Sequence, residues 1–368
     1  MALLFMDGLD LYASEIEAHE GGWQATGTGS NLDTTAGVNG GVAFEVGGGG
    51  SENGWYHNVP YGAPNDYSDH AAKTYIFQAW VKSTNISVGG NKPLLRLSSG
   101  ADEIIQLDLF TSGAFRMRTW DHTGLTLHTA SSTGAFASSS NWQFLELSFT
   151  LSSTVSAADA SWDLKIDGSS VYSNSGFVME YGTTNVQGVS NIYICNAGMA
   201  TWWWDDIILM DDTGADANLN GFTGARYIDT INVDGDGGTV DWTRNTGTND
   251  WEMVDDPLLT VDDDTTYVES STVGQEGRYA LATPSNTDDD VHAVQIRARL
   301  RKDDAGTRTI RGVMNVSGGT EEVTFQTLGP TTEYVWYHLG LRETNDTGGT
   351  PWTATEVGNT EIGVEIVS

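Results

Sequence analysis

Residues 145–149, LELSF, alternate apolar and polar side chains over their whole length. In a β-strand successive side chains point to opposite faces, so this spacing gives one strand an apolar face and a polar face. The same period of two recurs in residues 105–109, IQLDL, in residues 164–167, LKID, and in the second half at residues 292–300 and 361–367. The pattern predicts an all-β protein built from antiparallel strands.

Clusters of Gly, Ser, Asn and Thr separate these runs, as in residues 47–50, GGGG, and residues 167–170, DGSS. Such clusters end short strands and connect them by tight turns. Helical spacing is nearly absent, and only residues 11–19 offer apolar positions that could share one face of a short helix. We therefore expect β-sandwich or jelly-roll domains.

The chain has 368 residues, of which 39% are apolar, and this exceeds a single domain of roughly 100–150 residues. The run at residues 211–216, DDTGAD, follows an apolar strand and contains little that could pack in a core. We divide the chain there into two consecutive antiparallel β-sandwich domains, residues 1–212 and 213–368. No exact repeat is present, so a propeller or a solenoid is not expected.

Charge narrows the range of partners, because 17 Lys and Arg stand against 50 Asp and Glu, a formal net charge of −33. A chain this acidic repels phosphate backbones and anionic lipid headgroups, so we expect neither nucleic-acid binding nor membrane insertion. The first ten residues lack the basic region of a signal peptide, and one cysteine, Cys195, cannot form an internal disulfide. The excess of Asp over Glu is compatible with a marine setting.

Carboxylate chemistry is the first enzymatic hypothesis, since glycoside hydrolases place two carboxylates on either side of a sugar. Glu146 stands alone among apolar neighbours, while Asp205 and Asp206 are adjacent and are expected on opposite faces of a strand. No Gly-x-Ser-x-Gly motif is present, and Cys195 follows the apolar run of a predicted strand. The sequence therefore predicts a protein that is not an enzyme.

A metal site is suggested by Asn232, Asp234 and Asp236, which stand at positions 1, 3 and 5 of a calcium-loop pattern with Gly237 at position 6. Position 12 is Thr243, where the pattern requires a bidentate Glu. The missing ligand and the all-β context favour a hairpin or an inter-strand turn. We expect no cofactor, and structural calcium is the alternative that these residues leave open.

Aromatic residues are candidates for sugar stacking or for a protein interface, foremost Trp202, Trp203 and Trp204. Because consecutive strand residues alternate faces, we expect Trp202 and Trp204 in the core and Trp203 on an outer face. Trp55 and Tyr56 form a second aromatic segment that suits protein interfaces as well as glycans.

Arg297, Arg299 and Arg301 alternate with apolar residues, which places three guanidinium groups on one face of a strand. In an acidic chain this face could dock an acidic partner, including a second copy of the same chain. Internal pairing with Glu321, Glu322 or a nearby Asp is the alternative, and the sequence leaves both open.

The first half resembles the concanavalin A-like or laminin-G-like lectin sandwich. The resemblance lies in residues 74–82, TYIFQAWVK, 142–147, WQFLEL, 162–168, WDLKIDG, and 205–211, DDIILMD. The second half resembles regions of tailed-bacteriophage virion proteins. There it lies in Trp242, Thr243, Gly247 and Trp251, in the acidic residues 255–257 and 262–268, and in residues 351–353.

Together these resemblances imply a non-enzymatic bacteriophage virion protein, located in the virion as a capsid decoration, tail or fibre-associated component. Its expected partners are other virion proteins and further copies of itself, in a homo-oligomer. The alternative from the same resemblance is a lectin-like module that recognises host surface glycan.

Overall fold

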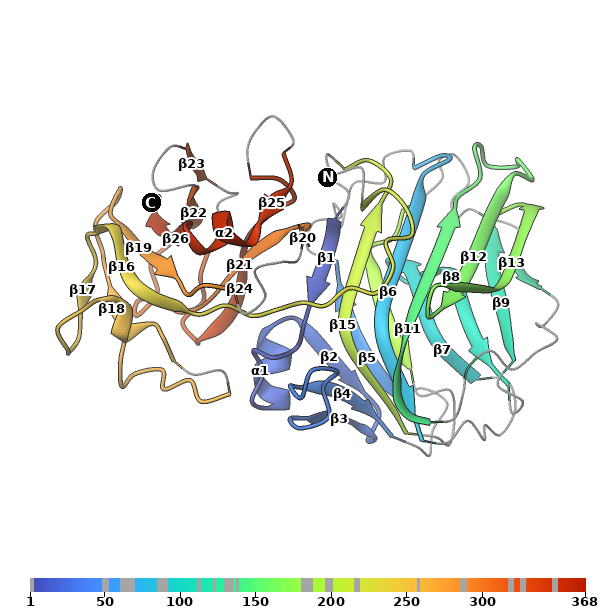
Figure 1. Cartoon of the computed structure of the whole chain (residues 1–368), viewed down its shortest axis with the longest axis horizontal. Coiled ribbons are helices and arrows are strands. Elements are labelled where there is room, and N and C mark those ends of the chain that lie inside the picture. The colour runs from blue at the N-terminus through green and yellow to red at the C-terminus, as the bar shows by residue number, and fades with distance from the viewer. Residues whose placement is uncertain are drawn as a thin grey trace. The chain divides into compact units, whose positions relative to one another are not determined.

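The computed structural model describes residues 3–47, 53–59, 70–84, 92–110, 114–121, 124–128, 136, 139–179, 188–195, 201–214, 219–256, 259–284, 290–316, 321–324, 329–345 and 350–368. The chain forms two compact units. Unit 1 comprises Met1–Asp10 and Gly22–Ile228, and unit 2 comprises Leu11–Gly21 and Asp229–Ser368. Figure 1 shows that strands dominate both units, which confirms the all-β antiparallel prediction.

Unit 1 contains an eight-stranded antiparallel sheet, the first sheet. Seven of its strands are neighbours in the order β13 (Ser169–Phe177), β12 (Ala160–Ile166), β11 (Ser139–Thr150), β6 (Thr74–Ser83), β15 (Trp202–Asp211), β4 (Ala43–Val46) and β3 (Ser30–Asp33). The eighth strand, β1 (Leu3–Asp7), pairs with the second half of β15.

The second sheet of unit 1 has seven antiparallel strands. Their order is β10 (Gly124–Leu127), β9 (Phe115–Asp121), β8 (Asp102–Leu109), β7 (Lys92–Ser99), β14 (Asn191–Cys195), β5 (Gly54–Asn58) and β2 (Trp23–Thr26). Strands distant in sequence are neighbours here, since β14 lies between β7 and β5.

Aromatic side chains from the two sheets meet in the core of unit 1. Phe44 of β4 stacks on Trp55 of β5 with ring centroids 4.3 Å apart, and it also meets Trp23 of β2 at 4.8 Å. All three side chains are fully buried. Two sheets that share a core in this way form a β-sandwich.

Strand β15 shows why the alternation determines the fold. Trp202 and Trp204 are fully buried, whereas Trp203 between them is half-buried on the opposite face. Trp204 meets Phe77 of β6 edge to face, and Trp202 meets Phe136 at 4.9 Å between ring centroids. The expected placement of the three tryptophans agrees with the structure.

Unit 2 is a smaller sandwich. Its five-stranded sheet has the order β16 (Val233–Val240), β19 (Glu276–Leu281), β26 (Glu361–Ile366), β22 (Ile310–Val316) and β23 (Glu321–Thr324). Three two-stranded ladders join β21 (Val294–Leu300) to β24 (Val335–Arg342), β17 (Thr243–Arg244) to β18 (Val268–Glu269), and β20 (Asp290–Val291) to β25 (Trp352–Thr353). Apolar side chains from both kinds of sheet, together with the helical Val357, share one core: Leu281, Ile296, Ile310, Met314, Val316, Leu339, Trp352 and Val357.

The described part of unit 2 also contains two short α-helices and one 3-10 turn. They are α1 (Glu15–Glu20), α2 (Ala354–Gly358) and η2 (Trp251–Met253). The Ser14 hydroxyl accepts a hydrogen bond from the backbone N–H of Glu17, so Ser14 caps α1. Helix α1 packs against β24. The helix expected within residues 11–19 is therefore present but begins and ends slightly later.

The two units do not divide the chain at residue 212. Residues 213–228 belong to unit 1, and residues 11–21 belong to unit 2 although they precede almost all of unit 1 in sequence. Thr223 shows why the first segment stays with unit 1, because its hydroxyl accepts a hydrogen bond from Gln78 of β6 at 2.7 Å. Composition alone could not reveal this long-range contact.

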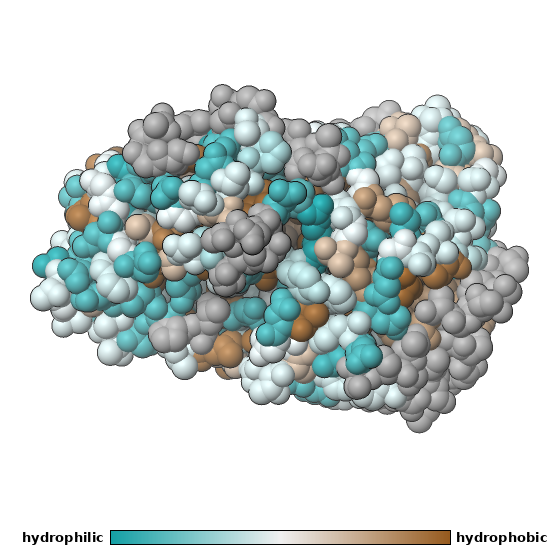
Figure 2. Space-filling model, in the orientation of Figure 1, coloured by the Kyte–Doolittle hydropathy of each residue, from teal (hydrophilic) through white to brown (hydrophobic). Residues whose placement is uncertain are grey.

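The surface is mostly polar on the side drawn in Figure 2, where strongly apolar residues appear only in small separate areas. Within the described ranges, none of the helices is both long and apolar enough for a bilayer-spanning segment.

The two neighbouring tryptophans Trp203 and Trp204 provide a test of the strand register. Trp204→Ala should lower the free energy of unfolding by about 3–5 kcal/mol, because it leaves a large cavity in the core. Trp203→Ala should cost about 1 kcal/mol, because it removes one hydrogen bond on the outer face. Urea unfolding followed by circular dichroism measures both, and equal losses would contradict the assigned faces.

Candidate functional site

A row of polar and aromatic side chains crosses the outer face of the second sheet. Each member is the direct cross-strand neighbour of the next, and each comes from a different strand. The row, called the cross-strand row below, consists of Gln24, Tyr56, Tyr193, Arg96, Gln106 and Arg118. With neighbouring strands about 4.8 Å apart, its ends are about 24 Å apart.

Alternation explains why these residues face away from the core. On β14, Ile192 and Ile194 are fully buried while Tyr193 between them is half-buried. On β5, Trp55 and His57 are buried on either side of the half-buried Tyr56. Once the apolar positions occupy the sandwich core, the intervening positions must line the opposite face.

The tyrosine end of the row is held by hydrogen bonds. The Tyr193 hydroxyl lies 2.5 Å from the Thr26 hydroxyl, and the Tyr56 hydroxyl donates to Asn191 Oδ1 at 3.0 Å. The two tyrosine rings are tilted, with centroids 6.2 Å apart. Burial raises the pKa of Tyr56 above its ordinary value, which keeps its hydroxyl protonated.

The arginine end is an ion-paired network. Arg96 lies over the Tyr193 ring at 5.4 Å, donates from Nε to Gln106 Oε1 at 3.0 Å, and pairs with Glu103 at 3.2 Å. Gln106 in turn donates to Asp108 Oδ1 at 2.6 Å. Tyr193, Arg96 and Gln106 are thus linked by a cation–π contact and a hydrogen bond, and Gln106 continues the network to Asp108.

Asp108 orients the last part of the network. Its side chain is completely buried, and Oδ2 accepts hydrogen bonds from Arg116 at 2.8 Å and from Arg118 at 2.6 Å. A buried carboxylate requires such partners, because an unpaired one would be costly to desolvate. Asp108 therefore fixes the guanidinium groups of Arg116 and Arg118 in position at one end of the row.

This arrangement suits a sugar chain chemically. Tyrosine rings can stack on the apolar faces of sugar rings, while guanidinium groups and the exposed amide of Gln24 can donate hydrogen bonds to hydroxyl and carboxylate oxygens. Gln106 is buried and serves to join Arg96 to Asp108. The members lie on paired strands rather than on loops, so the surface is preformed.

Of the residues expected from the sequence, Tyr56 lies in the row, while Trp55 is in the core against Phe44. Trp203 is on the outer face of the first sheet, where its indole N–H donates to Asp33 Oδ2 at 3.1 Å. The ammonium of Lys82 lies 5.2 Å from the Trp203 ring and 4.6 Å from the Trp142 ring. A lysine of the same chain therefore already contacts this aromatic pair.

The residues of the calcium-loop pattern do not form a loop. Asn232 immediately precedes β16, and Asp234 and Asp236 lie within this strand with exposed side chains on one face. Asp236 accepts a hydrogen bond from the backbone N–H of Trp251 at 2.8 Å. An extended strand cannot wrap these oxygens around one ion, and the interpretation as a turn is wrong for the same reason. Nowhere in the described ranges do three or more His, Cys, Asp or Glu residues form a metal-binding group.

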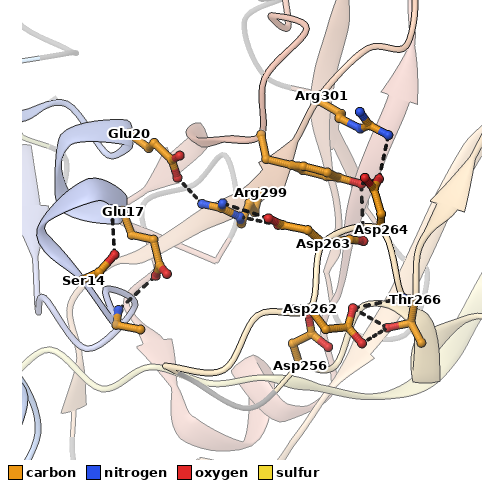
Figure 3. A network of polar contacts seen from close by, with 12 residues as sticks. Ser14, Glu17, Glu20, Asp256, Asp262, Asp263, Asp264, Thr266, Arg299 and Arg301 are labelled. Atoms are coloured by element: carbon orange, nitrogen blue, oxygen red, sulfur yellow. Dashed lines mark hydrogen bonds and ion pairs between the residues drawn. The ribbon is translucent and has the colours of Figure 1, made fainter.

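The arginine face of unit 2 pairs internally (Figure 3). Arg299 forms ion pairs with Glu20 and with Asp263, the latter at 2.8 Å, and Arg301 pairs with Asp264 at 2.6 Å. Arg297 donates to the Tyr12 hydroxyl at 2.7 Å. Of the two interpretations that the sequence left open, internal pairing with nearby Asp residues is the one that the structure shows, and Glu20 is an additional partner.

A buried acidic pair lies elsewhere in unit 1, at the bulge where β15 changes partner from β4 to β1. Asp205 and Asp206 are both buried, and Asp206 has a positive φ of 47°. Burial raises the pKa of Asp205 to about 8, and burial together with the Asp205 charge raises that of Asp206 to about 9. The bulge interrupts the regular alternation of faces in this part of β15.

Tyr193, Arg96 and Arg118 were not predicted from the sequence as members of a site. Residues 105–109 did indicate that Gln106 and Asp108 share a polar face. The pairing of β14 with β5 and β7 could not be predicted from the sequence. This pairing places Tyr193 between Tyr56 and Arg96.

Comparisons with known proteins add little to this geometry. No protein-family model matches the chain, and no curated protein sequence matches it. Among solved structures, endo-β-1,4-glucuronan lyase from the fungus Trichoderma reesei matches with 10% identity over 56% of this chain and 95% of its own, at a TM-score of 0.38.

Two further structures match at a similar level. The carbohydrate esterase from the Shiga toxin-encoding bacteriophage phi24B is 14% identical over 56% of this chain and 97% of its own, with a TM-score of 0.35. The ligand-binding domain of botulinum neurotoxin serotype D, in complex with N-acetylneuraminic acid, is 10% identical over 87% of this chain and 75% of its own, with a TM-score of 0.36. Similarity at this level does not transfer activity or ligand to this chain.

The acidic pair makes stability depend on pH. A carboxyl whose pKa is raised on folding stabilises the fold fully below its unfolded pKa of 3.8, and this stabilisation is lost as the pH rises toward 8–9. Urea midpoints should therefore fall between about pH 5 and about pH 9. Asp206→Asn should reduce this fall, whereas Asp212→Asn at an exposed position should not. Identical pH profiles for the parent and Asp206→Asn would contradict the prediction.

Proposed function

We propose that this chain is a glycan-binding protein whose ligand lies along the cross-strand row on unit 1. The observation that carries the proposal is the register, which places two tyrosines, two arginines and two glutamines side by side across six strands. A row about 24 Å long matches an extended polymer better than a small molecule. We propose binding without catalysis, because the sequence predicts a protein that is not an enzyme.

Tyr193 is at the centre of this proposal, since it contacts members of the row on both sides. Its ring faces Tyr56 at 6.2 Å and Arg96 at 5.4 Å. Loss of the ring should remove the stacking surface without removing any charge.

Binding of the purified full chain to a polysaccharide array tests the proposal. Tyr193→Ala should weaken binding about five- to tenfold, the amount expected for one aromatic stacking contact. Trp203→Ala, on the outer face of the first sheet, is the matched control and should bind like the parent. No binding by the parent at high concentration would refute the proposal, as would loss of binding in Trp203→Ala alone. Release of oligosaccharide products would refute the prediction that the protein binds the polysaccharide without cleaving it.

We include in the proposal two expectations from the sequence, the concanavalin A-like fold of unit 1 and the location in a bacteriophage particle. Two antiparallel sheets sharing a core support a concanavalin A-like sandwich for unit 1. Location in a bacteriophage particle, as a capsid decoration, tail or fibre-associated component, rests on the resemblance of the sequence. Mass spectrometry of purified particles is the measurement that decides it. A glycan-binding surface is compatible with such a location, because a particle must attach to its host.

A further inference from the structure

Arginine side chains gather on the cross-strand row, in a chain whose formal net charge is −33. Arg96 and Arg118 belong to the row, and Arg116 lies beside Arg118 because Asp108 Oδ2 accepts hydrogen bonds from both. Arg96 pairs with Glu103.

Arg118 has donors available for a ligand. Its Nε is held by Asp108 at 2.6 Å, and in the part of the chain that the structure describes its two terminal nitrogens make no hydrogen bond. About a quarter of the side chain, 24%, is exposed. A guanidinium fixed at Nε presents its remaining N–H groups in a planar fork that matches an oxyanion.

Arg96 is arranged in a similar way. Gln106 accepts from its Nε and Glu103 pairs with Nη1, so Nη2 is the nitrogen without a hydrogen-bond partner in the described ranges. The side chain is 29% exposed and its guanidinium lies over the Tyr193 ring. Arg96 and Arg118 are the cross-strand neighbours of Gln106 on its two sides, so one polymer along the row could reach both.

We propose that the ligand of the row is an anionic polysaccharide, whose carboxylate or sulfate groups are bound by Arg96 and Arg118 while its sugar rings stack on Tyr56 and Tyr193. This inference rests on the proposed glycan-binding function. The net negative charge of the chain opposes non-specific binding of a polyanion, so arginines placed along the row would confer both affinity and selectivity.

The test compares charged polymers with neutral partners of the same backbone. The probes are polygalacturonate and its carboxyl-reduced form, and dextran sulfate and dextran. The parent should bind at least one charged polymer about tenfold or more tightly than its neutral partner, and added salt should reduce this preference. The pair that shows the preference identifies the anion as carboxylate or sulfate.

Variants then assign the preference to the two arginines. Arg118→Gln and Arg96→Gln should each reduce the preference about tenfold, as expected for a charge-assisted hydrogen bond. Arg118→Lys keeps the positive charge but loses the planar pair of N–H donors. Its preference for the charged polymer should therefore lie between that of Arg118→Gln and that of the parent. Arg308→Gln in unit 2 removes an exposed arginine paired with Asp304 and is the control. Thermal unfolding of each variant shows whether unit 1 remains folded.

The outcomes separate this inference from the proposed function. Equal binding of charged and neutral polymers would overturn the anionic ligand and leave glycan binding intact. No binding of any polymer, here or on the array, would overturn both. A preference that survives in the double variant Arg96→Gln, Arg118→Gln would overturn the role of the row.

Discussion

Packing of the two sheets of unit 1 against each other is the interaction on which the rest of that unit depends. Phe44 stacked on Trp55 at 4.3 Å joins the first sheet to the second, and Trp23 extends the contact. Burying aromatic side chains of this size dominates the stability of a core. Because alternate side chains of each strand pack in that core, the side chains between them lie on the outer face of the sheet.

The cross-strand row results from this packing of alternate side chains in the core. On the second sheet the outward positions carry tyrosine, arginine and glutamine, and pairing aligns them from strand to strand. Hydrogen bonds join Arg96, Gln106 and Arg118 through Asp108, which is fully buried beneath Arg116 and Arg118. A connected network of this kind is rigid, which reduces the ordering that a ligand would have to induce.

Unit 2 depends on a segment from the beginning of the chain. Residues 11–21 supply helix α1, and Glu20 and Tyr12 are bound by Arg299 and Arg297 of β21. The arginine face therefore has a structural role within unit 2, and the loop at residues 262–264 supplies its other carboxylates. Contact across such a long stretch of sequence requires the chain to leave unit 2 and return to it.

The sequence by itself determined the all-β class, the burial of Trp202 and Trp204 with Trp203 on the other face, and the polar face at Gln106 and Asp108, because a period of two is a local property of a strand. Only the tertiary structure decided that Tyr193 lies between Tyr56 and Arg96, that Asp234 and Asp236 extend along a strand, and that residues 11–21 belong to unit 2. These features depend on which strands pair and in what register. That choice is made by contacts between residues far apart in the chain, and local spacing does not encode it.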